Sequence, residues 1–207
     1  MTVIIDYGVG NLFSLKSSFA SLGEDVTVSG DKETILRADR IILPGVGAFE
    51  DAAKKLCANG LDTVIKEAVA KGTPLLGICL GMQMLFEKSY EFGVHDGLCL
   101  IPGSVTPFAE KVKPLKVPQI GWNRLTFPKG KEKSRLFKYV NEGDYVYFVH
   151  SYSAVGCDEY VSSVTDYGAI LTASAENGCV YGVQFHPEKS GNVGLNILRA
   201  FLEITRE

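Results

Sequence analysis

Residues Pro74–Met82 read PLLGICLGM, an apolar run that enters the pattern G-x-C-x-G. The run predicts a buried strand, a sharp turn at Cys79 and a helix that begins at Leu80. Gly77 and Gly81 lack side chains, so the strand and the helix can approach each other closely around the cysteine. The pattern is the cysteine version of the turn that holds a nucleophile in strained backbone geometry.

Toward the N-terminus, short β-branched apolar runs alternate with longer segments of helical periodicity. Strands are predicted at Thr2–Asp6, Asp25–Ser29, Arg40–Leu43 and Pro74–Gly77. Besides the helix from Leu80, helices are predicted at Asn11–Leu22, Phe49–Cys57 and Leu61–Lys71. Strands that alternate with helices favour a parallel sheet that is covered on both faces.

The amino-acid composition changes from about Val105 onward, where proline, glycine and aromatic residues become frequent. Period-two runs predict antiparallel strands at Tyr145–Val149, Tyr160–Val164, Ala169–Ala175 and Val180–Gln184. The apolar spacing of Asn192–Ile204 predicts a helix that closes the fold against the sheet. The expected fold class is therefore α/β, with a central, mostly parallel sheet flanked by helices and additional antiparallel strands in the second half. No long linker interrupts the chain, so we expect one domain that spans residues 1–207.

The composition argues against several classes of function. The 207 residues are 46% hydrophobic and include 21 basic and 24 acidic side chains, so the chain has no excess of positive charge for the nucleic-acid backbone. The first residues form no basic region and their apolar run is only one strand long, which indicates neither a secretion signal nor a membrane span. We expect a cytoplasmic location.

Neither a metal nor a cofactor is expected. The five cysteines form no C-x-x-C pair and are odd in number, which fits a reducing compartment better than a disulfide framework. With three scattered histidines and no H-E-x-x-H pattern, zinc binding has no support. Gly8 and Gly10 follow a strand as in a dinucleotide-binding loop, but Phe13 occupies the place of the third glycine.

Two segments together favour nucleophilic catalysis. The N-terminus of the helix from Leu80 is expected to stabilise a thiolate on Cys79 by its dipole, although a cysteine in a tight turn can also be a buried apolar residue. Far away in the sequence, Tyr181–Ser190 reads YGVQFHPEKS. Residues two apart in an extended backbone share a face, so Glu188 can lie beside His186 and hold its imidazole in one tautomer. A surface histidine paired with a carboxylate is the alternative for this segment considered by itself.

An oxyanion hole would complete such a site. The backbone N–H of Leu80 is one candidate donor. The turn Pro44–Gly47, which reads PGVG after a predicted strand, is a candidate for the other because its glycines can adopt unusual dihedral angles. An ordinary loop between a strand and a helix is the alternative for this turn.

The motifs PGVGAF, GICLGMQ, FVHSY and GVQFHPEKS together resemble those of class I glutamine amidotransferases, which have a flavodoxin-like fold. More narrowly, IDYGVGNL, GWN and FVHSY are similar to the glutaminase subunits of imidazole glycerol phosphate synthase, from histidine biosynthesis. The resemblance covers nearly the whole chain. It implies that Cys79 attacks the side-chain amide of glutamine to form a γ-glutamyl thioester and ammonia, and that water activated by His186 then releases glutamate.

The same resemblance implies the residues of the glutamine pocket. It places Gln83 and Glu91 near the amino-acid end of the substrate, with a solvated loop carboxylate as the alternative for Glu91. The other implied positions are His150, Ser151 and Tyr152 along the pocket, and Val46 and Gly47 at the oxyanion hole.

The implied partner is a cyclase subunit with a (β/α)₈ barrel, which forms a heterodimer with this chain and receives ammonia without its release into solvent. Asn11, in the segment Tyr7–Asn11, and Trp122 are candidates for the partner interface, because small residues and a large aromatic side chain occupy presumed loops. Trp122 can equally be a core residue.

Three alternatives stay open at this point. The chain can be the amidase subunit of a paralogous system, such as one that aminates a sugar for surface polysaccharide. It can be a stand-alone hydrolase of γ-glutamyl bonds. From a different class, it can be a binding protein that keeps the fold without the activity.

Overall fold

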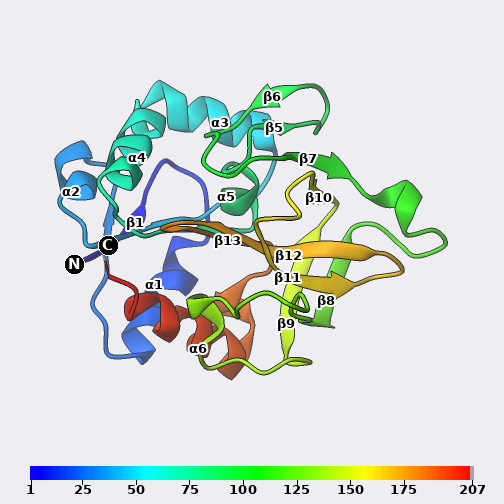
Figure 1. Ribbon diagram of the computed structural model, residues 1–207. Coiled ribbons are helices and arrows are strands. Elements are labelled where there is room, and N and C mark those ends of the chain that lie inside the picture. Colours follow the sequence, from blue (N-terminus) through cyan, green and yellow to red (C-terminus); the bar gives the residue numbers. More distant parts are fainter. Residues whose placement is uncertain (206–207) are drawn as a thin grey trace.

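A seven-stranded sheet forms the centre of the protein, of which the computed structural model describes residues 1–205. Its strand order is β11-β12-β13-β4-β3-β1-β2 (Figure 1). The strands are β11 (Val161–Asp166), β12 (Ile170–Asn177), β13 (Val180–Val183), β4 (Leu75–Ile78), β3 (Arg40–Leu43), β1 (Thr2–Ile5) and β2 (Thr27–Ser29). The strands from β13 to β2 are parallel, and β11 and β12 extend the sheet in antiparallel pairing. The predicted α/β class is confirmed.

One strand pairing differs from the prediction. Strand β13 was expected among the antiparallel strands, and it does pair antiparallel with β12. On its other side it pairs parallel with β4, with Gly182 opposite Gly77. This pairing brings the end of β13, where the HPE segment begins, next to the end of β4, where Cys79 lies.

Helices cover both faces of the central sheet (Figure 1). On one side lie α1 (Leu12–Ser21) and α6 (Gly191–Leu202), and on the other lie α2 (Lys32–Leu36), α3 (Phe49–Ala58) and α4 (Leu61–Ala70). Strand β1 is buried on both faces, because Ile4 belongs to the core under α1 and α6 while Val3 and Ile5 belong to the opposite core. A central strand of a parallel sheet has this continuous apolar character. No helix within residues 1–205 is both long enough and apolar enough to cross a bilayer.

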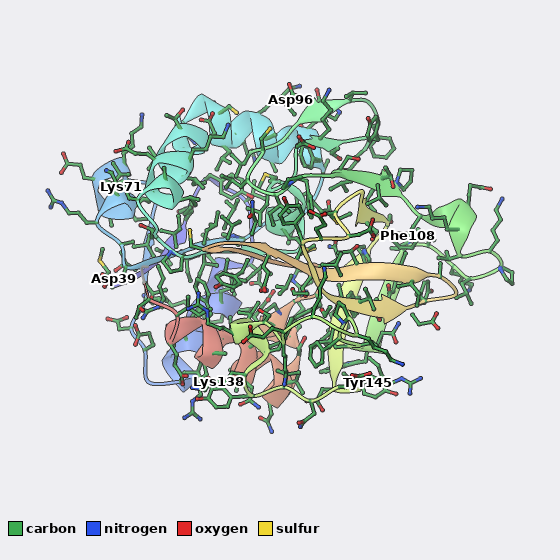
Figure 2. The ribbon with its side chains drawn as sticks, viewed as in Figure 1. Asp39, Lys71, Asp96, Phe108, Lys138 and Tyr145 are labelled. Carbon is green, nitrogen blue, oxygen red and sulfur yellow. The ribbon has the colours of Figure 1, made fainter. Side chains whose placement is uncertain are left out.

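Shorter elements complete the fold, and β9 and β10 among them contribute residues to the candidate site. A four-stranded sheet contains β10 (Tyr152–Val155), β7 (Ser104–Pro107), β5 (Lys88–Ser89) and β6 (His95–Asp96), and a separate pair contains β8 (Gln119–Arg124) and β9 (Tyr145–His150). The 3₁₀ helices within residues 1–205 are η1 (Ala109–Lys111), η2 (Arg135–Phe137) and η3 (Pro187–Lys189). Charged side chains such as Lys71 and Lys138 project from the periphery, whereas Phe108 is buried (Figure 2).

The helix predicted from Leu80 begins at that residue and is short. Helix α5 (Leu80–Gln83) is a single turn. After it, Leu85 N donates to Met82 O, three residues back, which forms a tighter turn than an α-helix. Met84 O accepts from Leu98 N. A helix this short has only a small dipole, so the stabilisation of a thiolate must come mainly from other groups.

Candidate active site

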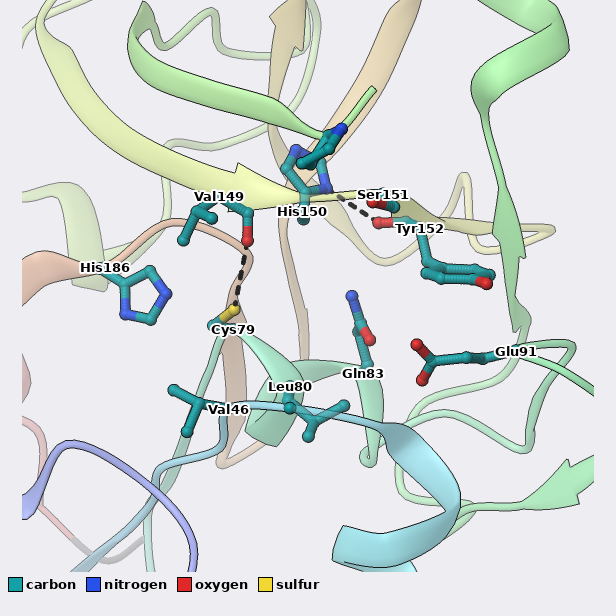
Figure 3. Close-up of a pocket in the computed structure, with 12 residues that line it drawn as sticks. Val46, Cys79, Leu80, Gln83, Glu91, Val149, His150, Ser151, Tyr152 and His186 are labelled. Carbon is teal, nitrogen blue, oxygen red and sulfur yellow. Dashed lines mark hydrogen bonds between the residues drawn. The ribbon is translucent and has the colours of Figure 1, made fainter. Parts of the chain in front are cut away.

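Cys79 lies on a strained turn between β4 and α5. Its backbone has φ 56° and ψ −112°, a region that residues with a side chain rarely adopt. Its N–H donates to Val183 O at 2.8 Å, so the turn is anchored to the end of β13. This geometry directs the thiol away from the sheet and into a cavity beyond the strand ends (Figure 3).

The two glycines around Cys79 are required by close backbone packing. A Cβ atom on Gly81 would lie 1.9 Å from Leu43 O, and one on Gly77 would lie 2.7 Å from Gly81 O. Neither neighbour is a flexible side chain that can move aside. The G-x-C-x-G pattern therefore fixes the elbow through three stacked segments: β4, α5 and the end of β3.

His186 and Glu188 form a buried pair. His186 Nδ1 lies 2.8 Å from Glu188 Oε1, and the two side chains are 3% and 1% exposed. Burial by itself lowers the pKa of His186, but hydrogen bonding with Cys79 and Glu188 outweighs it and raises this pKa to about 9. An imidazolium beside the cysteine is therefore the favoured form at neutral pH.

The segment that presents His186 is held by a compact set of hydrogen bonds. His186 N donates to Tyr147 O at 2.9 Å, which attaches the segment to β9. Ser190 Oγ donates to His186 O at 2.6 Å and accepts from Tyr147 N at 2.9 Å. These bonds join the loop after β13, the 3₁₀ helix η3 and β9, so the ring position is set by three elements.

One glutamine reaches the sulfur, and a second glutamine holds the first. Gln184 Nε2 lies 3.7 Å from Cys79 Sγ, and its Oε1 accepts from Gln83 Nε2 at 2.9 Å. The Cys79 thiol in turn faces Val149 O at 4.0 Å. An N–H aimed at sulfur stabilises a thiolate, a role that was predicted for the dipole of α5. Gln184 was not predicted, although its position two residues before His186 in an extended segment gave the signal.

The candidate oxyanion donors border the same cavity. Val46, Gly47 and Leu80 all line it, with Val46 43% exposed. The turn Pro44–Gly47, which contains Val46 and Gly47, is fixed at its start because the Tyr7 hydroxyl donates to Pro44 O at 2.7 Å. Within residues 1–205, no backbone or side-chain acceptor takes up the N–H groups of these three residues. They are thus free to bind an oxygen that carries developing negative charge.

The cavity has a volume of about 320 Å³, enough for a small amino acid. Figure 3 shows Cys79 between His186 on one side and Glu91 on the other. The predicted positions are brought together here, since the lining includes Val46, Gly47, Cys79, Leu80, Gln83, Glu91, His150, Ser151, Tyr152 and His186. Glu91 is not a solvated loop carboxylate, because its Oε2 accepts from Phe49 N at 2.6 Å.

His150 differs from His186 in protonation and in contacts. Its Nδ1 lies 2.8 Å from Tyr152 O and its Nε2 lies 2.9 Å from Gln119 Oε1. Burial lowers the pKa of His150 to about 4, which keeps its ring neutral at pH 7. A neutral ring has one N–H, so it donates a hydrogen bond to only one of these two oxygens. His150 can therefore shape the wall of the cavity, and its ring faces Gln119, which was not predicted as a site residue.

The arrangement is suited to acyl transfer. A cysteine on a strained turn, an imidazolium beside it and a buried carboxylate behind the imidazole supply nucleophile, acid and base, and orienting group. Free N–H groups at the rim can bind an oxyanion. Within the described part of the chain, no group of three or more His, Cys, Asp or Glu side chains could hold a metal ion.

Of the two candidate interface residues, Asn11 is half-buried and Trp122 is exposed. Asn11 caps α1, with its Oδ1 accepting from Ser14 N at 3.3 Å. Trp122 is 54% exposed, so the core alternative for this residue is wrong. Its ring contacts Tyr147 edge-on, with 6.1 Å between centroids.

Comparisons with known proteins agree with this geometry. Residues 3–204 match the family model described as glutamine amidotransferase class-I. The chain is 48% identical over 208 aligned residues to the imidazole glycerol phosphate synthase subunit HisH of Geobacillus kaustophilus (strain HTA426), and the match covers 99% of this chain and 97% of that protein. The protein of the same description from Aquifex aeolicus (strain VF5) is 48% identical, with 97% and 95% covered.

Solved structures share the fold at much lower identity. One described as a glutamine amidotransferase is 19% identical with a TM-score of 0.75, and the match covers 97% of each chain. The structure of PurLQS from Thermotoga maritima is 17% identical with a TM-score of 0.73, covering 97% of this chain and 96% of that one. At these identities the likeness concerns the fold alone.

Proposed function

The chain belongs to the class I glutamine amidotransferase family, and from this premise we propose that it is the glutaminase subunit of an imidazole glycerol phosphate synthase. In this role it hydrolyses L-glutamine to glutamate and ammonia as a single domain in the cytoplasm. The observation that carries the chemistry is the buried Cys79–His186–Glu188 constellation at the end of the parallel strands. The identity of 48% to two subunits of that synthase over nearly the full length supports the pathway.

The reaction follows from the positions of the three groups. The Cys79 thiolate attacks the amide carbon of glutamine and forms a tetrahedral intermediate. The negatively charged oxygen of this intermediate accepts hydrogen bonds from the N–H groups of Leu80 and of the turn at Val46 and Gly47. His186 gives its proton to the departing nitrogen, so ammonia leaves and a γ-glutamyl thioester remains. Water then loses a proton to His186 and attacks the thioester, which releases glutamate and restores the thiolate.

The carboxylate of Glu188 serves His186 in both half-reactions. With its side chain 1% exposed and its Oε1 against His186 Nδ1, it holds the ring orientation and stabilises the imidazolium. The N–H of Gln184 near the sulfur supports the thiolate form between turnovers. Gln83, Glu91, His150, Ser151 and Tyr152 border the part of the cavity that remains for the amino-acid end of glutamine.

A (β/α)₈-barrel cyclase is the partner that we propose, with a heterodimer interface beside the triad. Trp122 lies over the start of α6, since a Cβ on Gly191 would be 3.9 Å from its ring. Large apolar side chains of the β8–β9 pair share this surface, with Ile120 62%, Trp122 54% and Tyr145 50% exposed. An apolar patch of this kind marks an interaction surface. Asn11 at the start of α1 is the second residue that we propose for the interface. Ammonia released next to such an interface could pass to the cyclase without protonation in bulk water.

Steady-state glutamine hydrolysis tests the proposal. The rate is measured for the chain alone, and then with a histidine-pathway cyclase subunit and its ribonucleotide substrate. We expect slow hydrolysis by the isolated chain and a large increase when both are added. No increase, with Cys79 still alkylated by a glutamine-like electrophile, would retain the amidotransferase chemistry and move the partner to another pathway. Fast hydrolysis by the isolated chain would contradict activation by the partner.

A further inference from the structure

Helix α3, which follows the oxyanion turn, has no cap of its own. Its N-cap residue is Ala48, whose methyl group cannot accept the hydrogen bonds of the first N–H groups. The missing acceptor comes from a distant loop, because Glu91 Oε2 accepts from Phe49 N at 2.6 Å. A carboxylate at this position is also favoured by the helix dipole. The end of the turn is thus fastened to the loop after β5.

The rest of the turn is fixed at its start and free in its middle. Tyr7 and the close approach of Gly45 to Gly81, where an added Cβ would lie 2.6 Å from the Gly81 nitrogen, hold the beginning. Gly47 has φ +90°, and an added Cβ there would meet nothing within 4 Å. Within residues 1–205, the bond from Glu91 is the only side-chain hydrogen bond to residues 45–49.

The same carboxylate faces the cavity. Glu91 lines the pocket together with Gln83 and Tyr152, and Figure 3 shows its carboxylate pointing toward Gln83 below the Tyr152 ring. Burial and, after it, the charge of Glu91 raise the pKa of the Tyr152 hydroxyl. In the described part of the chain, no donor lies within hydrogen-bond distance of the other oxygen, Oε1. That oxygen is available to a cationic group of a ligand.

We propose that Glu91 is a positioning residue for the oxyanion turn: Oε2 holds the first N–H of α3 while Oε1 meets the amino group of bound glutamine. This inference rests on the proposed glutaminase function. The charge that recognises the substrate and the acceptor that fixes the turn are then one group, so substrate occupancy and the turn conformation are coupled. Loss of Glu91 affects the transition state through the turn in addition to weakening substrate binding.

Hydrogen exchange of the full-length, substrate-free chain tests the fastening directly. The variants are Glu91→Ala, which removes the acceptor, and Glu91→Gln, which keeps an oxygen acceptor without the charge. Glu50→Gln is the matched control, because Glu50 lies in the same first turn of α3 but is paired with Lys54 on the surface. We expect Glu91→Ala to speed exchange of the Phe49 amide, whose hydrogen bond to Glu91 is lost, by about tenfold or more, with Glu91→Gln much closer to the unmodified chain. Equal exchange in Glu91→Ala and the unmodified chain would overturn the proposal.

Kinetics with two amides separate positioning from recognition. Glutaric acid monoamide is glutamine without the amino group, so a residue that only binds this group cannot affect its hydrolysis. In the activated complex, Glu91→Ala is expected to have an about tenfold lower kcat on both amides. Glu91→Gln is expected to differ from the unmodified complex mainly by a higher KM for glutamine. Unchanged hydrolysis of the monoamide by Glu91→Ala would overturn the positioning role. Failure of the glutaminase proposal has a different signature, since the unmodified chain would then hydrolyse neither amide while the exchange result stands.

Discussion

The two sides of the cavity differ in how their conformation is fixed. On the nucleophile side, Cys79 is 7% exposed and the side chains of His186 and Glu188 are nearly inaccessible, held by glycine packing and by the ends of β4 and β13. On the oxyanion side, Val46 is 43% exposed and Gly47 is unpacked. The nucleophile side is therefore ready before any partner or substrate arrives. The oxyanion side is where ligands and a partner subunit can still change the geometry.

The largest effect is expected at the nucleophile. Cys79→Ala removes the attacking atom, so glutamine hydrolysis by the complex should fall by at least about 10⁴-fold while ammonia-dependent synthesis is retained. The rates of both reactions are measured on the same preparation. Cys57→Ala and Cys99→Ala are the controls, because these cysteines are exposed and are not part of the cavity lining. Loss of ammonia-dependent synthesis as well would argue against the division of labour.

The next largest effect is expected at Glu188. Glu188→Gln keeps the shape of the side chain but loses the charge that stabilises the imidazolium and fixes the tautomer of His186. A decrease in kcat of about a thousandfold is expected, from kinetics at saturating glutamine. Glu203→Gln, on an exposed carboxylate, is the matched control. A loss below tenfold in Glu188→Gln would mean that the pair is structural.

Two glycine substitutions sharpen the contrast between the sides. Gly81→Ala forces a Cβ against the Leu43 carbonyl, so the free energy of unfolding should fall by about 3 kcal/mol or more. Gly47→Ala meets no atom but is disfavoured at φ +90°, so the turn should shift with less than about 1 kcal/mol lost from global stability and about tenfold lost from kcat. Denaturant unfolding and glutaminase kinetics measure the two quantities. Similar stability losses in both variants would contradict the comparison.

The pKa values of the two cavity histidines should be shifted in opposite directions from the ordinary value. Nitrogen-15 NMR can follow all three histidines, and His186 is expected to titrate near pH 9 and His150 near pH 4. Cys79→Ala should lower the pKa of His186, because hydrogen bonding with Cys79 is the first of the effects that raise it. A pKa of His186 near its ordinary value of 6.5 in the unmodified chain would contradict a protonated His186 at neutral pH.

The same shifts predict how stability depends on pH. The raised pKa of His186 adds stability that is complete below about pH 6.5 and is lost as the pH rises through 9. The lowered pKa of His150 adds stability that is present above about pH 6.5 and is lost as the pH falls through 4, by about 3 kcal/mol. Urea unfolding at pH 4 and pH 7 measures the second effect, and His150→Asn should reduce the difference.

The sequence predicted the parts of the fold that rest on local patterns. Strand β3 (Arg40–Leu43) was predicted with its observed bounds, because a short β-branched run between turns has little ambiguity. Strands β5 and β6 are two residues each, and no periodicity can be detected over that length. The single turn of α5 ends because Leu98 and its neighbours take up the carbonyls that a longer helix would use, and these residues are distant in sequence.

The residues of the candidate site likewise fall into those that local sequence patterns predict and those that only the assembled structure brings together. The elbow at Cys79 and the spacing of His186 and Glu188 follow from rules about turns and extended backbone, so they could be proposed from sequence. Gln184 could have been found by the same alternation. The bond between Glu91 and Phe49 joins residues 42 positions apart, and only the assembled structure brings them together.

Labelling of the isolated chain by a glutamine-like electrophile tests the central claim most directly. Peptide mass spectrometry locates the label among the five cysteines, with and without excess glutamine. Because the nucleophile side is fixed without a partner, we expect rapid labelling at Cys79 and protection of this residue by glutamine. Labelling confined to the exposed Cys57 and Cys99, with no protection by glutamine, would contradict the assignment of Cys79 as a nucleophile that is ready before the partner binds.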